Sequence, residues 1–194
     1  MAEGEKMKAN PARVKLTYDD FLLFPDDGKR HELIDGEHYV TPSPNIRHQT
    51  ILGNLYFLIR TWLEQHPVGR AFMAPLDVVF TQFDVVEPDL LFVSRIRAAD
   101  ILTAKHVTGA PDIVVEIGSP STRKRDETIK RRLYERSGVA EYWVVDPDLD
   151  VVRVYRNRDG RFDRPVELRA DAGDVLTSPH LDGLEMPVGR IFAD

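Results

Sequence analysis

Three carboxylates in apolar segments are the residues of this sequence best suited to chemistry. Glu116 lies inside the run IVVEIG, Asp89 directly precedes LLFV, and Glu32 lies in the segment HELI. A buried carboxylate is costly unless a partner compensates for its charge. Hard divalent cations such as Mg²⁺ prefer oxygen ligands. The pattern therefore indicates a metal site to which three adjoining strands contribute Glu32, Asp89 and Glu116.

Asp112 competes with Asp89, because both follow a proline. Asp112 and Glu116 share one predicted strand and are four residues apart, which is roughly 13 Å in extended chain. They could not both contact one metal ion, whereas Asp89 comes from another strand. Structural roles stay open for each carboxylate taken alone: an edge position or an ion pair for Glu116, and a strand-start turn for Asp89. Only the combination favours a functional site.

A basic segment follows Glu116. Residues 121–136, STRKRDETIKRRLYER, hold seven basic and three acidic residues, a local charge of +4 in a chain whose net charge is −6. Such a segment beside carboxylates suits a polyanion such as a phosphodiester backbone, although a solvated helix face is the simpler alternative. Asp126, Lys130 and Tyr134 form an i, i+4 stripe, which could turn one face toward the site.

Other catalytic fingerprints are absent from the sequence. There is no glycine-rich phosphate loop and no GxSxG elbow. His31-Glu32 begins like a zinc HExxH motif, but Asp35 stands where the second histidine is needed. Without cysteine, disulfides, thiolate metal sites and cysteine nucleophiles are excluded.

Composition bounds the class of protein. The chain has 194 residues, 42% of them hydrophobic and 30% charged, as expected for one globular domain rather than a disordered chain. No apolar run approaches the roughly 20 residues of a membrane span, and the polar N-terminus is unlike a secretory signal. We expect a flexible tail over 1–15, a single domain over 16–194 and a soluble, cytoplasmic protein.

Local patterns predict the elements that position these residues. Asp35-Gly36 predicts a hairpin with strands over 30–34 and 37–41. Apolar residues at helical spacing predict a helix over 46–65, and short apolar runs predict buried strands over 111–117 and 141–146. A charged helix should begin near Ser119-Pro120 and end at Gly138. Residues 70–93 and 151–157 look strand-like, 95–109 resemble a surface excursion, and 160–194 suggest short strands and turns. The order indicates an α/β fold, one mixed sheet flanked by helices.

The segments HELIDGE, SPNIRHQ, EPDLLFV and PDIVVEIGSPSTRKRDETIKRRLYERSGVAEYWVVDP together resemble the Uma-two type of restriction endonuclease, a family of the PD-(D/E)XK nuclease superfamily. The resemblance covers roughly residues 17–146. It implies a restriction-endonuclease-like α/β core and magnesium-dependent hydrolysis of a phosphodiester, with manganese as an alternative ion. Nucleic acid, in the first instance DNA, would be the partner, and related nucleases pair to cut two strands, so we expect a homodimer.

The resemblance also implies roles for single residues. Asp89, Glu116 and Glu32 would be catalytic and hold the metal. The superfamily pattern places a lysine two residues after the acid, where this chain has Gly118. The lysine would come from the following helix, with Lys130 the candidate and Lys124 the alternative. Apart from the resemblance, Arg123, Lys124 and Arg125 are candidates for contacting the backbone of the substrate, and His48 and Gln49, at the start of the 46–65 helix, for lining the cleft. A helix-surface role for His48 stays equally open.

Two other functions compete with the nuclease. One is a non-catalytic nucleic-acid-binding or protein-interaction module on a nuclease-like scaffold, because a fold does not fix a function. The other is a glycosidase with Asp89 and Glu116 as acid and base. A glycosidase needs exposed aromatic residues along a sugar cleft, and Trp62 and Trp143 both lie in apolar patterns.

Overall fold

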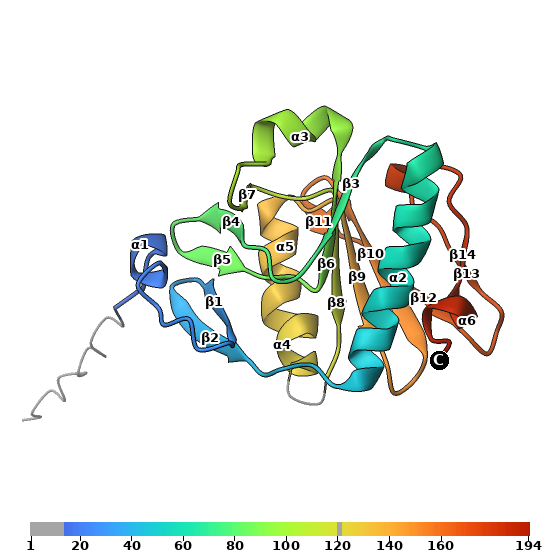
Figure 1. Cartoon of the computed structure of the whole chain (residues 1–194), viewed down its shortest axis with the longest axis horizontal. Helices are drawn as coiled ribbons and strands as arrows, with labels where there is room; N and C mark the ends of the chain where they lie inside the picture. The colour runs from blue at the N-terminus through green and yellow to red at the C-terminus, as the bar shows by residue number, and fades with distance from the viewer. Residues whose placement is uncertain (1–13, 120–121) are drawn as a thin grey trace, which may run out of the picture.

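The computed structural model describes residues 14–119 and 122–194, which form a mixed α/β fold (Figure 1). The expected tail therefore lies almost wholly outside the described residues, as does Pro120 of the predicted helix start. Lys15 and Leu16 are already attached to the fold, since the Leu16 N–H donates to the carbonyl oxygen of Gly36 at 2.9 Å.

The largest sheet in the described residues runs in the order β11-β10-β9-β8-β6-β3, with β12 pairing to β10. The β8–β9 pair is parallel and its other pairs are antiparallel. The predicted strands at 111–117, 141–146 and 151–157 are confirmed within two residues. The strands are β3 (Gly69–Met73), β6 (Leu90–Ser94), β8 (Ile113–Ile117), β9 (Glu141–Asp146), β10 (Val151–Arg158), β11 (Arg161–Phe162) and β12 (Val166–Arg169).

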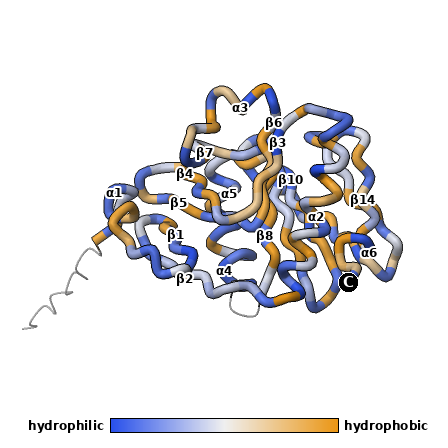
Figure 2. Tube along the Cα trace, viewed as in Figure 1, coloured by the Kyte–Doolittle hydropathy of each residue, from blue (hydrophilic) through white to orange (hydrophobic). Residues whose placement is uncertain are grey.

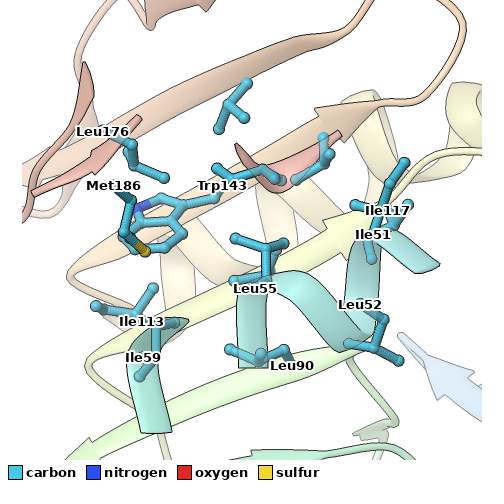
Figure 3. Packing of buried hydrophobic residues seen from close by; sticks show 14 of the residues in the cluster. Ile51, Leu52, Leu55, Ile59, Leu90, Ile113, Ile117, Trp143, Leu176 and Met186 are labelled. Atoms are coloured by element: carbon cyan, nitrogen blue, oxygen red, sulfur yellow. The ribbon is translucent and has the colours of Figure 1, made fainter. Parts of the chain in front are cut away.

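Both faces of this sheet are buried, because its central strands are apolar at nearly every position (Figure 2). Residues of odd number on β8, such as Val115, pack with α2 (Ile46–Gln65) in one core. Residues of even number, such as Val114, pack in a second core with α5 (Arg131–Ser137). Figure 3 shows the first core, where Leu55 and Ile59 of α2 lie against Trp143 and Ile113.

Helix α2 forms at the predicted residues for local reasons. The Asn45 side chain accepts the His48 backbone N–H at 2.8 Å and caps the first turn. Its buried residues recur at three- and four-residue spacing, so one stripe faces the sheet. These buried residues are His48, Ile51, Leu52, Leu55, Ile59 and Leu63.

A second sheet departs from the expectation of a single one. It runs β2-β1-β5-β4-β7 and contains the predicted hairpin, whose turn residues Asp35 and Gly36 both have positive φ, 53° and 73°. The Asp35 N–H also donates to Asp84 at 2.9 Å, which fixes the turn against β5. The strands are β1 (Arg30–Ile34), β2 (Glu37–Thr41), β4 (Val78–Thr81), β5 (Asp84–Val86) and β7 (Val107–Thr108).

The prediction that residues 95–109 lie at the surface is confirmed for most of the segment. This segment forms α3 (Arg95–Ile101) and β7, and its Ile101 and Val107 are buried in the second core. These two buried side chains alone do not make a periodic pattern in the sequence.

The charged helix after β8 contains an unexpected π-helical segment. It runs as α4 (Arg123–Arg125), a π turn (Asp126–Lys130) and α5, and ends as predicted at Gly138, where φ is 81°. π turns occur frequently at functional sites. Here the π turn buries Asp126 and Lys130 on the side that faces the sheet.

The remaining elements lie near the two ends of the chain. Thr17 caps α1 (Tyr18–Phe21) with a capping box to Asp20. The C-terminal segment completes the first core with Leu176, Leu181 and Met186. Its elements are β13 (Val175–Leu176), the 3₁₀ turn Pro179–Leu181, β14 (Met186–Pro187) and α6 (Val188–Ile191). No helix among the described residues is long and apolar enough to cross a membrane.

Candidate active site

Strand register brings two of the predicted carboxylates together. Leu90 of β6 pairs with Val115 of β8, so the next position along this antiparallel pair sets Asp89 beside Glu116. Side chains directly opposite each other in such a pair lie on the same face. That face is the one covered by α5, and both carboxylates line one cleft there.

Glu116 is buried and receives two hydrogen bonds from the helix that covers it. Lys130 Nζ lies 2.8 Å and the Tyr134 hydroxyl 2.5 Å from the same oxygen, Oε1. Burial raises the pKa of Glu116 to about 8, against the opposing charge of Lys130 and with a further rise from Asp89, Asp126 and Glu32. The predicted stripe of Asp126, Lys130 and Tyr134 therefore does face the sheet.

Lys130 joins Glu116 to Glu32. Its Nζ lies 2.7 Å from Glu32 Oε1, and both side chains are almost fully buried. Burial alone would lower the pKa of Lys130, but the attraction of Glu116 and Glu32 outweighs it and the pKa is raised. Lys124, the alternative lysine, is exposed one and a half turns earlier. The structure thus brings Lys130, rather than Lys124, to the carboxylates.

Glu32 is close to the cleft but is already engaged by other groups. Besides Lys130, its oxygens accept the Glu87 backbone N–H at 3.1 Å and the Thr41 hydroxyl at 3.4 Å. Arg125 approaches to 3.6 Å. Glu32 is not among the residues that line the cleft. A direct ligand role for Glu32 stays a prediction, and the geometry favours a role in holding Lys130.

Asp89 is held in its ionised form by three donors. Arg30 lies 2.7 Å from Oδ1, while His48 Nε2 and the Ile117 N–H lie 3.1 Å and 2.8 Å from Oδ2. Burial pushes the pKa of Asp89 upward, but the hydrogen bond from His48 and the charge of Arg30 lower it to about 2. Sequence reasoning missed Arg30, whose contact spans 59 positions; its place on the first hairpin strand, two residues before Glu32, was the only signal.

The cleft has a volume of about 110 Å³ and is lined by ionisable residues from five parts of the chain. Arg30, His48, Asp89 and Glu116 line it together with the helix residues Arg125, Asp126 and Lys130. Asp126 is buried, and its Oδ1 has no partner among the described residues. No tryptophan, tyrosine or phenylalanine is among the residues that line the cleft, which argues against a sugar-binding site.

The donor set fits a hydrated divalent cation. At the cleft, four carboxylates lie near three permanent cations among the described residues. The carboxylates are Glu32, Asp89, Glu116 and Asp126, and the cations are Arg30, Arg125 and Lys130. Burial raises the pKa of Asp126 as well as that of Glu116. The described residues contain no group of three histidine or acidic side chains placed to enclose a metal. Mg²⁺ needs no such cage, since it keeps several waters and is held by one or two carboxylates and the substrate. The residues therefore fit magnesium at Asp89 and Glu116.

The other predicted contact residues divide into two groups. His48 and Arg125 line the cleft, and Gln49 lines an adjoining cavity. Arg123 does not line the cleft, because its guanidinium pairs with Asp146 at 3.0 Å and Asp148 at 2.7 Å. Lys124 is not among the lining residues either.

Asp112, the competitor of Asp89, has a structural role. It is buried at the opposite end of β8 from Glu116, where it accepts the Ser94 N–H at 2.7 Å and lies 3.5 Å from Arg97. The argument from strand spacing that separated it from Glu116 is therefore confirmed.

Comparisons with known proteins agree with this architecture. Residues 18–189 match the model of the Uma2 family, described as "Putative restriction endonuclease". A solved structure from Anabaena variabilis, titled a "putative nuclease belonging to DUF820", superposes with a TM-score of 0.77. It shares 22% identity over 91% of this chain and 97% of its own. No curated protein matches the sequence. Since the family model spans most of the chain, which also has the expected restriction-endonuclease-like fold, the protein belongs to the Uma2 family.

Proposed function

We propose that this protein is a metal-dependent endonuclease that hydrolyses phosphodiester bonds of DNA. The observation that carries the proposal is the juxtaposition of two buried carboxylates with a buried lysine at one cleft. Asp89 and Glu116 face it from neighbouring strands, and Lys130 contacts Glu116 at 2.8 Å. The family match supports a nuclease in general terms.

Asp89 and Glu116 would hold Mg²⁺, with Mn²⁺ as an alternative, and waters would complete the coordination. When bound, such an ion lowers the pKa of a water molecule and neutralises negative charge on the phosphate. Glu32 is the third carboxylate of the predicted set, and we assign it the holding of Lys130, which it contacts at 2.7 Å.

The chain's own side chains would act on the substrate as follows. Lys130 places a permanent positive charge beside Glu116, where it stabilises charge developing on the phosphate or orients the attacking water. Tyr134 fixes the Glu116 carboxylate through its hydroxyl. Arg30 and His48 keep Asp89 ionised and oriented. Arg125, also in the cleft lining, is placed to contact a backbone phosphate.

The experiment combines metal titration with DNA cleavage. Mg²⁺ and Mn²⁺ are titrated by calorimetry into the wild type, Glu116→Ala and the control Glu185→Ala, which removes an exposed carboxylate outside the cleft. Plasmid nicking is followed on the same samples. We expect binding and nicking in the wild type and the control, and loss of both in Glu116→Ala. A wild type that neither binds metal nor cuts nucleic acid would instead indicate a binding module on a nuclease scaffold.

The assembly of the active form is a separate part of the proposal. A symmetric homodimer would place one active site at each strand of a duplex, so that both strands are cut in one binding event. Sedimentation velocity with and without DNA measures the oligomeric state directly. A monomer in both conditions that still linearises plasmid in one binding event would contradict the homodimer.

A further inference from the structure

A second, larger cavity opens beside the cleft. Its volume is about 480 Å³, against about 110 Å³ for the cleft itself. The two share Arg30, Thr41, His48, Asp89 and the segment 42–44, so they form one continuous depression. A substrate bound at the cleft would extend into this cavity. Its chemistry therefore bears on what the substrate is.

The walls of the larger cavity combine apolar side chains with polar and charged ones. Pro42, Pro44 and Pro75 present flat aliphatic rings, and Leu52 of α2 and Met73 of β3 complete the surface. Met73 keeps 39% of its surface exposed and is therefore accessible to a ligand. The volume of the cavity lies within the roughly 300–1,000 Å³ that is typical of ligand pockets.

The charge of the cavity is wrong for a second phosphate. Of its five charged lining residues, three are acidic, namely Asp26, Glu87 and Asp89, and two are basic, Lys29 and Arg30. A phosphodiester backbone is bound through an excess of cations. The part of a nucleic acid that suits these walls is the base, which has apolar faces and an edge of hydrogen-bonding groups.

Two lining residues have buried polar atoms without a partner in the described part of the chain. These are Glu87 Oε2, an acceptor, and His48 Nδ1, whose ring is already fixed through Nε2 to Asp89. An unsatisfied buried polar atom costs free energy, and a ligand group recovers it when the side chain turns toward the cavity. The amino groups of nucleobases are donors of the kind that a carboxylate oxygen accepts.

We infer that this cavity is a nucleobase subsite that takes an unpaired base next to the scissile phosphate. The inference rests on the proposed nuclease function and specifies its substrate class. A base inside a duplex is stacked and paired, so only a single strand or an extruded nucleotide can enter such a pocket. The preferred substrate is therefore DNA with unpaired nucleotides at the cut, rather than a regular duplex.

The test measures binding in the presence of a chelator, so that it does not depend on cleavage. Fluorescence anisotropy compares three labelled probes: a single DNA strand, its duplex, and a strand of equal length made of abasic sugars. The abasic strand has the same phosphates and lacks only the bases. We expect the wild type to bind the single strand about fivefold or more tighter than the other two, because burial of roughly 40 Å² of a base's apolar face in the cavity is sufficient for that factor.

Met73→Trp fills the cavity, and Val68→Trp is its control, because Val68 is 44% exposed and is not a lining residue. We expect the preference for bases to disappear in Met73→Trp and to persist in Val68→Trp. Gln49→Ala, an exposed lining residue on α2, gives a second variant that leaves the core intact and should reduce the preference several-fold. Thermal unfolding confirms that each variant is folded.

The outcomes separate the subsite from the nuclease. Equal binding of the single strand and the abasic strand, or an unchanged preference in Met73→Trp, would overturn the subsite. Nicking of duplex plasmid would then still support the endonuclease. Conversely, a base preference that Met73→Trp abolishes, in a wild type that cuts no nucleic acid, would keep the subsite and refute the proposed enzyme.

Discussion

Replacing Lys130 with methionine should destabilise the protein in a strongly pH-dependent way. Lys130 Nζ lies 2.7 Å from Glu32 and 2.8 Å from Glu116, and only 3% of its side chain is exposed. Methionine has a similar length, so packing changes little while the charge is lost. Removing one partner of a buried ion pair costs about 3–5 kcal/mol, because the other partner is left uncompensated.

The pH dependence follows from the two carboxylates that remain. Glu32 and Glu116 would then lose the cation that they share, Arg125 at 3.6 Å would contact only Glu32, and the pair takes up a proton. A carboxyl whose folded pKa is raised binds its proton more tightly in the folded state, so stability falls as pH rises through that range. A destabilisation of about 3–5 kcal/mol corresponds to a rise in pKa of roughly 2–4 units. The loss should therefore be large at about pH 8 and small at about pH 5.

Urea unfolding, followed by the fluorescence of the buried Trp143, measures this difference at both pH values. Lys124→Met is the matched control, since Lys124 is an exposed lysine of the same helix and its loss should change stability by less than about 0.5 kcal/mol. Nicking should also be lost in Lys130→Met and kept in the control. Equal stability of Lys130→Met and wild type at about pH 8, or the same loss at both pH values, would refute the reasoning.

Three further substitutions have distinct expected outcomes. Burial and the nearby Asp77 raise the pKa of Glu87 to about 7, so the free energy of unfolding falls as pH rises toward neutrality and Glu87 becomes charged. Glu87→Gln should reduce this loss of stability between about pH 5 and about pH 8 by on the order of 1 kcal/mol after solvent screening, as measured by urea unfolding at both pH values. Tyr134→Phe removes the 2.5 Å hydrogen bond to Glu116 and should cost about 1–3 kcal/mol in thermal or urea unfolding, with a lower nicking rate; unchanged nicking would argue against a positioning role. Gly69→Ala would place a Cβ 2.4 Å from the Phe92 ring and should destabilise by more than about 2 kcal/mol in urea unfolding, whereas full stability would mean that β3 shifts easily.

Local chemistry made part of this fold predictable. The Asp35-Gly36 turn and the Asn45 cap each act within a few residues, and the hairpin strands and α2 lie at the predicted positions. The same holds for Lys130, because a stripe at helical spacing already set it on one face with Tyr134. These features were predictable because they depend on interactions between residues that are close together in the sequence.

Long-range pairing made the rest unpredictable. The second sheet depends on the parallel contact of β4 with β7 and on the single pairing of Leu33 with Val85, neither of which leaves a local signal. The partner of Asp89 was likewise unpredictable, because Arg30 reaches it across 59 positions. The sequence predicts Glu32 as a metal ligand, whereas in the structure Glu32 contacts Lys130. Which charges neutralise one another in a buried cluster depends on their positions in three dimensions, which the sequence pattern does not give.

The lysine between Glu32 and Glu116 bears on whether the fold would need the proposed magnesium ion. Many small metalloproteins are unfolded without their ion, because binding of the ion provides much of the free energy of folding. Here the ammonium group of Lys130 already neutralises charge between Glu32 and Glu116, so the fold does not need a metal ion for that purpose. Magnesium would add only the mass-action increment of a ligand that binds the folded state. The protein should therefore survive chelators with its fold intact, so that fluctuations in metal supply would govern when it acts and leave its lifetime unchanged.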